Sequence, residues 1–185
     1  MRYSLCLLSL PLSLVFLSPA SAFAGQPEPE ASTVVQEFLD YLLKPDADIS
    51  TDAAARQKWL GTNLRARFDA ATQAVVEARK RPGVDGPDPA VPDNGTFLDS
   101  WDLPTTCRAE RSVVGHDGIT VRIVCDWGPE TNYPGLRREA EVTTVEEGGA
   151  WRIRNIALHK NAYAGESNLL ELLETLRRDA ENAGR

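Results

Sequence analysis

Apolar positions near the start of the chain repeat at the spacing of an amphipathic helix. The repeat predicts a first helix that begins at a capping box of Thr33 and Gln36. The helix is expected to end at Lys44-Pro45, because proline disfavours helical backbone in the residue before it. Its apolar face, which must be buried against another element, comprises Val34, Val35, Phe38, Leu39 and Leu42.

Two further helices are predicted before the pattern changes. Ser50 or Thr51 can cap a helix that runs to Leu60, and a third helix covers residues 62–80. Residues 81–94 (RPGVDGPDPAVPDN) contain four prolines and two glycines, which predicts a loop. In a compact domain a loop of this length is usually functional or disordered.

The second half of the chain alternates with a period of two, which predicts antiparallel strands. Strands at 105–114 and 119–127 flank a cluster of turn residues, Gly115-His116-Asp117-Gly118. Folded as a hairpin around this turn, the two strands pair Val114 with Ile119.

The same hairpin brings Cys107 and Cys125 within one residue of facing each other. A one-residue bulge or a five-residue loop would place them directly opposite, at a separation that a disulfide can bridge. We therefore predict a buried disulfide, with two buried thiols as the alternative. Closing this loop would stabilise the fold by on the order of 3 kcal/mol in the chain-entropy model.

The last predicted strand, at 150–159, has a break in its alternation. It follows a strand at 136–145 and the turn Glu147-Gly148-Gly149. A bulge near Arg154-Asn155 is predicted, because it would return to one face the apolar side chains of this strand, Trp151, Ile153, Ile156 and Leu158.

The pattern ends in an amphipathic helix at 168–182, capped by Ser167. Helices followed by a meander indicate an α+β fold. We expect a single domain over residues 32–182, in which the N-terminal helices pack on a curved antiparallel sheet of about four strands and the C-terminal helix follows.

The first 24 residues are typical of a secretory signal peptide. Arg2 precedes an apolar run too short for the ~20 residues that span a bilayer, and small residues lead up to Ala24. The sequence therefore predicts cleavage after Ala24, a mobile leader at 25–31, and a periplasmic or secreted protein without a membrane anchor. An uncleaved anchor is the alternative.

The composition of the chain limits which partners it can bind and which catalytic sites it can form. The chain has 20 Lys and Arg against 27 Asp and Glu, a formal charge of −7 that becomes −8 without Arg2, the only charged residue of the signal. Nucleic acid is not an expected partner, because it demands a basic face. The two histidines, His116 and His159, have no nucleophile or carboxylate at motif spacing. We expect no cofactor and no metal.

Carboxylates gather in and after the proline-rich loop. Their density is compatible with Ca²⁺, but the spacing fits no EF-hand loop and solvated loop carboxylates are commoner. Asn94-Gly95-Thr96 is formally a glycosylation sequon, although Asn-Gly is also a favoured turn pair, and we prefer the turn. The carboxylates in question are Asp85, Asp88, Asp93, Asp99 and Asp102.

Four segments occur in an order that resembles secreted bacterial proteins of the nuclear transport factor 2-like superfamily. They are VVQEFLDYLL, KWLGTNLRARF, GTFLDSWDLPT and EEGGAWRIRNIAL, and the resemblance covers roughly Ser32 to Leu158. It implies a cone of long helices against a strongly curved sheet, enclosing a pocket. The superfamily includes isomerases, dehydratases and many non-catalytic binders, so the fold alone does not assign a function.

The resemblance directs attention to Asp99, Trp101 and Asp102, which would lie near the mouth of the pocket. In enzymes of the superfamily a pocket Asp acts as general base, which requires a raised carboxyl pKa. Tyr41 and Trp59 are candidate neighbours of that Asp. The alternative, which we favour, is that Asp99 or Asp102 bonds loop amides while Trp101 packs beneath the helices.

Together these observations favour an exported, non-catalytic binding or interaction protein. Its partner would be a protein or a small apolar ligand. A sharper version is an inhibitor or immunity protein whose acidic surface meets a basic envelope enzyme. The alternative function is a cofactor-free lyase or isomerase that uses an Asp in the cone pocket.

Overall fold

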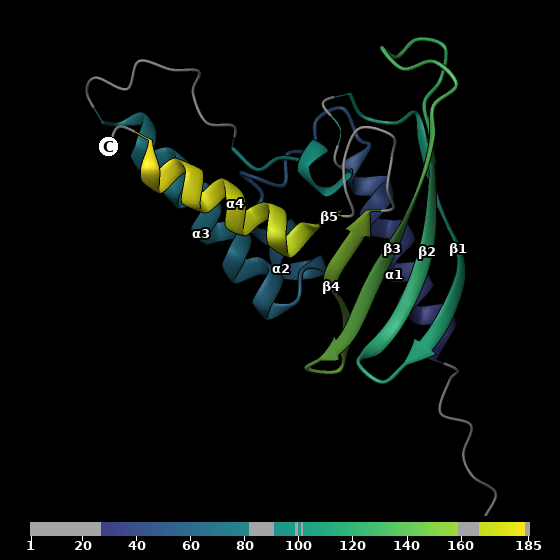
Figure 1. Cartoon of the computed structure of the whole chain (residues 1–185). Helices are drawn as coiled ribbons and strands as arrows, with labels where there is room; N and C mark the ends of the chain where they lie inside the picture. Colours follow the sequence, from purple (N-terminus) through teal and green to yellow (C-terminus); the bar gives the residue numbers. More distant parts are fainter. Residues whose placement is uncertain (1–26, 82–90, 99, 101, 159–166, 184–185) are drawn as a thin grey trace, which may run out of the picture.

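The computed structural model describes residues 27–81, 91–98, 100, 102–158 and 167–183 (Figure 1). The predicted signal peptide, its cleavage site and most of the proline-rich loop lie outside these residues. In chain order the elements are α1 (Pro27–Leu42), α2 (Ala53–Trp59), α3 (Thr62–Arg79), the 3-10 helix η1 (Gly95–Leu98), β1 (Thr106–Gly115), β2 (Gly118–Asp126), β3 (Arg137–Glu147), β4 (Ala150–Leu158), β5 (Ser167–Asn168) and α4 (Leu169–Asn182).

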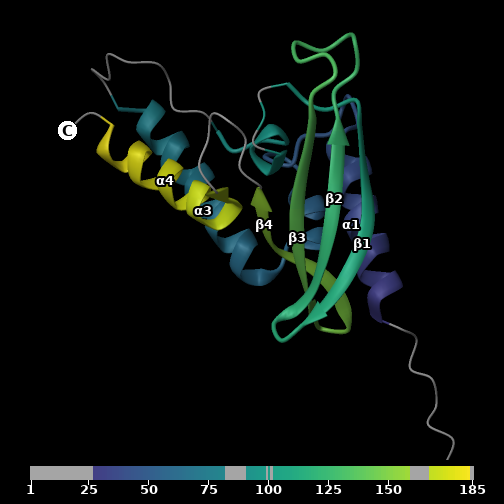
Figure 2. The same ribbon diagram turned by 45° about the vertical axis from the view of Figure 1, so that its right-hand side comes forward.

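The strands form one antiparallel sheet in the order β1-β2-β3-β4-β5, in which β5 contributes two residues. The sheet is curved and does not close into a barrel (Figures 1 and 2). Helices precede and follow this meander, which confirms the predicted α+β fold with about four strands and a C-terminal amphipathic helix.

The helices divide into two groups around the sheet. Helix α1 runs along one face and packs against β1, β2 and β4, and this face is called the inner face below. Helices α3 and α4 lie side by side and extend away from the sheet beyond β4 (Figure 2). They run in the same direction, because Arg67 pairs with Glu174 near one end while Arg81 donates to the carbonyl oxygens of Glu181 and Ala183 at the other.

The core lies between the inner face and the helices. Alternate residues of each strand point inward, as expected for a half-buried antiparallel sheet. The largest fully buried side chains come from α1, α3, η1, β2, β4 and the segments that flank α2, and they are Phe38, Leu39, Leu42, Ile49, Leu60, Leu64, Phe68, Phe97, Ile119, Ile123, Ile153 and Ile156.

The predicted cysteine pairing is confirmed. Cys107 lies directly opposite Cys125, the two form a disulfide, and both are buried. Val114 lies opposite Ile119, also as predicted. A bulge between Ala109 and Ser112 shifts the register by one residue, which places the two cysteines directly opposite each other.

The predicted bulge in the last long strand is confirmed as well. Thr143 faces Asn155 while Thr144 faces Ile153, so Arg154 is the extra residue. Ile153 and Ile156 are therefore both buried on the inner face despite their odd spacing.

The start of the first helix differs from the prediction. Helix α1 begins at Pro27, so residues 27–31 are not a mobile leader, and Ala31 is fully buried in the core. Proline is tolerated in a first helical turn because its missing N–H has no intrahelical partner there. Thr33 is not a cap: the residue lies within α1, is exposed, and donates its hydroxyl to the carbonyl oxygen of Pro29 one turn earlier.

Two other predicted caps are displaced by one or two residues. Helix α2 is capped by Asp52, whose side chain accepts from the N–H of Ala55, and not by Ser50 or Thr51. Helix α4 is capped by Asn168, which accepts from the N–H of Glu171, and not by Ser167. In each case the residue immediately before the helix is itself a strong capping residue.

Candidate functional site

The structure brings together two of the five candidate pocket residues. The rings of Tyr41 and Trp59 lie with their centroids 4.6 Å apart, and Phe38 packs beside Trp59. The hydroxyl of Tyr41 donates to Asp52 at 3.1 Å. A surface hollow of about 420 Å³ adjoins this cluster and is lined by Tyr41, Lys44, Pro45, Asp46, Ala47, Asp48, Thr51 and Asp52.

The electrostatics of this cluster do not resemble those of a general base. Burial, followed by the hydrogen bond to Asp52, raises the pKa of Tyr41 to about 12. The pKa of Asp52 is lowered, chiefly because its carboxylate accepts from the N–H of Ala55 and then from Tyr41. A base in an apolar pocket needs a raised carboxyl pKa. Tyr41 and Asp52 therefore form a pair that fixes the start of α2 to α1.

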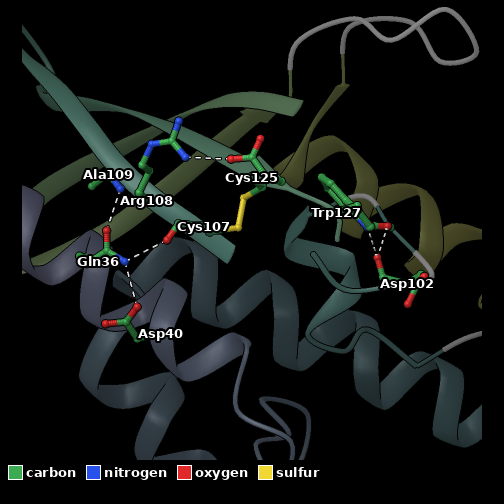
Figure 3. The surroundings of a disulfide bond; sticks show 10 residues. Gln36, Asp40, Asp102, Cys107, Arg108, Ala109, Cys125 and Trp127 are labelled. Carbon is green, nitrogen blue, oxygen red and sulfur yellow. Dashed lines mark hydrogen bonds and ion pairs between the residues drawn. A yellow bond between two sulfur atoms is a disulfide. The ribbon is translucent and has the colours of Figure 1, made fainter. Parts of the chain in front are cut away.

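Asp102 lies in a different place, between η1 and β1. Its carboxylate accepts from the N–H of Asn132 at 2.6 Å, and its carbonyl oxygen accepts from the indole N–H of Trp127 at 2.7 Å (Figure 3). For Asp102 this confirms the interpretation that we favoured, a carboxylate bonded to a loop amide. Asp99 and Trp101 lie outside the described residues.

Asn94 has a role that the sequence did not predict. Its side chain is buried, with 7% of the residue exposed, and it donates to the carbonyl oxygens of Leu42 and Ala47 at 2.9 Å each. Its Oδ1 accepts from the N–H of Ile49 at 3.0 Å. The amide therefore joins the loop before η1 to the end of α1 and the α1–α2 connection. Its nitrogen and its oxygen are both hydrogen-bonded, which argues against glycosylation of Asn94. The only sequence signal was the Asn-Gly pair itself.

The structure also shows the role of one acidic residue of the proline-rich loop. Asp93 accepts from the N–H and the hydroxyl of Thr96, so it starts the turn of η1. Over the described parts of the chain, no group of three or more His, Cys, Asp or Glu side chains is arranged to hold a metal ion. Asp85, Asp88 and Asp99 fall outside those parts.

A second hollow, of about 490 Å³, lies at the tip of the β1–β2 hairpin. Its apolar wall is formed by Val114, Ile119 and Trp151. Its polar wall contains Glu146, the turn residues His116 and Asp117, and Arg154. These side chains are called the hairpin end below.

The hairpin end is exposed and well anchored. Val114 is 59% exposed, as is Val113 on the opposite face of β1, and these are the highest values among the exposed large apolar residues of the described chain. Arg154 donates to the carbonyl oxygen of Asp117 at 3.0 Å, and Thr144 donates to that of Ile119 at 3.0 Å. Sequence reasoning treated His116 as a solvated turn residue, which its exposure confirms, but it missed the hollow beside the turn.

The outer face of the sheet carries ion pairs between neighbouring strands. Arg108 pairs with Asp126 at 2.8 Å, and Arg122 pairs with Glu139. Arg137 lies 3.7 Å from Asp126. Glu110 lies 3.4 to 3.9 Å from Arg108, Arg122 and Arg137 and joins these pairs into one network. Opposite charges alternate here, so the outer face is not an acidic surface even though the whole chain is acidic.

Comparisons with known proteins give no relative: no family model, no curated protein and no solved structure matches this chain. The nuclear transport factor 2-like assignment therefore stays a prediction. No described helix is both long and apolar enough to span a membrane.

Proposed function

We propose that this chain is an exported, non-catalytic interaction protein that binds a protein partner with the hairpin end. The observation that supports this proposal is the 59% exposure of Val114 beside a hollow whose apolar wall includes Trp151. An exposed apolar side chain that borders an apolar hollow with a polar rim is typical of a binding surface.

The arrangement at the hairpin end fits a protein partner in shape and in chemistry. Apolar side chains form the centre, and Glu146, Asp117 and Arg154 supply a charged rim. Bonds from Arg154 and Thr144 hold the backbone of the turn in place. A surface that is already ordered loses less entropy on binding than a mobile loop does.

Charge indicates the kind of partner. The chain carries −7 with its signal segment and −8 without it. Such a charge speeds encounter with a basic protein and slows encounter with an acidic one. An inhibitor or immunity protein of a basic envelope enzyme fits both the charge and the predicted export.

The nuclear transport factor 2-like superfamily remains part of this proposal. Helices that precede a curved antiparallel meander, with α1 along its inner face, support that assignment. Many members of the superfamily bind without catalysis, in keeping with the function proposed here.

The test of the proposed function is capture from an envelope extract by the immobilised chain 25–185. Val114→Asp is expected to abolish capture, because it places a charge in the apolar centre at a site too exposed to matter for folding. Val76→Asp is the matched control: this valine lies on α3, is 40% exposed and should not affect capture. Full capture by Val114→Asp, or no specific capture by the unchanged protein, would contradict the proposal.

Export and charge steering are tested separately. If the signal is cleaved as predicted, the secreted chain begins at Gly25, which N-terminal sequencing can establish. The rate of association with the captured protein should fall as salt rises, because screening shortens the reach of the charges. A rate that does not respond to salt would remove the basic partner from the proposal.

A further inference from the structure

Strand β1 forms one edge of the sheet, and half of this edge is covered. Gln36 of α1 accepts from the N–H of Ala109 at 2.8 Å and donates to the carbonyl oxygen of Cys107 at 3.1 Å (Figure 3). One side-chain amide thus makes the two bonds that a neighbouring strand would make there. Its own orientation is fixed by Asp40, which accepts from the same Nε2 at 2.9 Å.

The other half of the edge, residues 111–115, runs from the second bulge residue to the turn and has no such cover. Among the described residues, no strand pairs with β1 on the side opposite β2. Arg111, Val113, Val114 and Gly115 are exposed. This stretch is called the open edge below.

The direction of the peptide groups along the open edge follows from the hairpin. Gly115 and Gly118 flank a two-residue turn and face each other, so they form a hydrogen-bonded pair. Such pairs alternate with non-bonded ones, which places Val113 in the next bonded pair with Thr120. The N–H and C=O groups of Ser112 and Val114 therefore point away from β2, toward the open edge.

An edge of this kind is normally protected. Bulges, charged side chains, proline or a covering helix prevent one sheet edge from pairing with another. The first half of β1 has a bulge and the Gln36 cover, whereas the open edge presents two exposed valines, a residue type that favours strands. The contrast within one strand indicates that the open edge has a partner.

We propose that the open edge pairs antiparallel with the open edge of a second copy of this chain, about a two-fold axis at Val113. In this register Val113 faces its own counterpart, and Ser112 of each copy exchanges backbone hydrogen bonds with Val114 of the other. Each two-fold contact uses the same surface twice, as the commonest protein dimers do.

The limits of the open edge fit a second copy. Gln36 and the bulge bound it on one side, and the turn at His116-Asp117 bounds it on the other. When residues 111–115 of two copies pair about Val113, the turn of each copy falls beside the bulge of the other and neither reaches the Gln36 cover. Arg111 then lies opposite Gly115, close to the acidic Asp117 of the other turn.

The dimer is expected to be weak and to depend on salt. Five paired residues bury far less than the roughly 1,200 Å² of stable interfaces. Each mature copy would carry a charge of −8, so the copies repel each other at long range, although the open edge itself contains Arg111 and no acidic residue. Salt should therefore strengthen the association by screening, the opposite of its effect on a basic partner.

The test is directed disulfide cross-linking of the chain 25–185 with oxidised glutathione. Val113→Cys should yield mostly linked dimer, because facing residues of a non-bonded antiparallel pair lie about 4.5 Å apart at their Cα atoms, within the reach of a disulfide. Val114→Cys should link poorly, since in this register it faces Ser112 and not itself. Val76→Cys on α3 controls for random collision.

Equal cross-linking of Val113→Cys and Val76→Cys would overturn the proposal, and preferential linking of Val114→Cys would overturn the register. Sedimentation of the unchanged protein supplies a second measurement: the average mass should rise with concentration and with salt, and a mass that stays monomeric at millimolar concentration would also overturn it. Val114 belongs both to the hairpin end and to the open edge, so Val114→Asp is expected to weaken both contacts. The two inferences are distinguished by their readouts, because cross-linking of Val113→Cys reports contact between two copies of this chain, whereas capture reports a different protein.

Discussion

A buried amide is stable only if both its donors and its acceptor find partners. Asn94 meets this condition with Leu42 at the end of α1 and with Ala47 and Ile49 in the connection between α1 and α2. The side chain thereby bonds three backbone groups, of which those of Leu42 and Ile49 belong to buried residues. Asn94 holds the end of α1 and the start of η1 in one arrangement, under which Tyr41 and Asp52 meet.

Replacing Asn94 by alanine should therefore be costly. We expect Asn94→Ala to lower the free energy of unfolding by about 3 kcal/mol, because it strands two carbonyl oxygens and one N–H. Urea unfolding followed by tryptophan fluorescence measures this loss. Asn63→Ala on the exposed face of α3, where the side chain bonds only Arg67 in the described structure, should change the same quantity by less than about 0.5 kcal/mol. Similar losses for both variants would contradict the role assigned to Asn94.

The roles of residues such as Asn94 could not be predicted from the sequence, because their partners lie far away along the chain. The bulge in β4 could be predicted because the apolar side chains of a strand must all lie on the face that packs against the core, and their spacing broke that alternation. The register of Cys107 and Cys125 could be predicted because a short turn fixes how the two strands of a hairpin pair. Asn94 and Gln36 act on backbone groups tens of residues away, so no local pattern marks them. The prediction that Asp102 lies beside Tyr41 and Trp59 in one pocket was wrong for a similar reason. Asp102 bonds Asn132 and Tyr41 bonds Asp52, and no local pattern marks either contact.

At the scale of elements, the N-terminus of α3 is capped from a distant part of the chain. Gly61 has no side chain to cap the helix, and Glu147 from the end of β3 accepts from the N–H of Thr62 at 2.9 Å and from its hydroxyl at 2.8 Å. A β-carbon at position 61 would come within 3.1 Å of the Glu147 carboxylate. Glycine therefore leaves the room that the carboxylate uses, and the β3–β4 hairpin is tied to α3.

This cap predicts a dependence of stability on acid. The bonds from Thr62 lower the pKa of Glu147 in the folded protein below its usual 4.5. Its stabilising contribution is therefore fully present above about pH 5.5 and is lost as the pH falls below 4.5 through the folded pKa. Glu147→Gln should cost about 1 kcal/mol at pH 7, as loss of an N-terminal cap does, and progressively less below pH 4.5.

The measurement is the free energy of unfolding in urea at a series of pH values from 7 to 3. Glu146→Gln is the neighbouring control, since Glu146 is exposed on the same strand and should have no comparable effect. A difference between the unchanged protein and Glu147→Gln that stays constant down to pH 3 would show that the carboxylate charge has no part in the cap.

At the scale of the whole molecule, burial is unevenly distributed. The main core joins α1, α2, the sheet and the nearer parts of α3 and α4. The far ends of α3 and α4, which extend beyond the sheet in Figures 1 and 2, form a separate small cluster. Its buried members are Val75, Ala78 and Ala180, so it contains less apolar volume than the main core. Because stability follows local burial, these helix ends should open without unfolding the sheet.

Hydrogen exchange detects such local opening. Amides near the ends of α3 and α4 should exchange much faster than those of β2, whose inward side chains are fully or nearly fully buried. Ala180→Gly should accelerate exchange in both helix ends, because glycine costs a helix about 1 kcal/mol, while the slow amides of β2 keep their rates. Leu173→Ala, which removes a side chain from the main core, should instead accelerate exchange in β2 as well. If Ala180→Gly accelerated β2 as strongly as Leu173→Ala does, the helix pair and the sheet would unfold as one unit, and the separate cluster would have no independent stability.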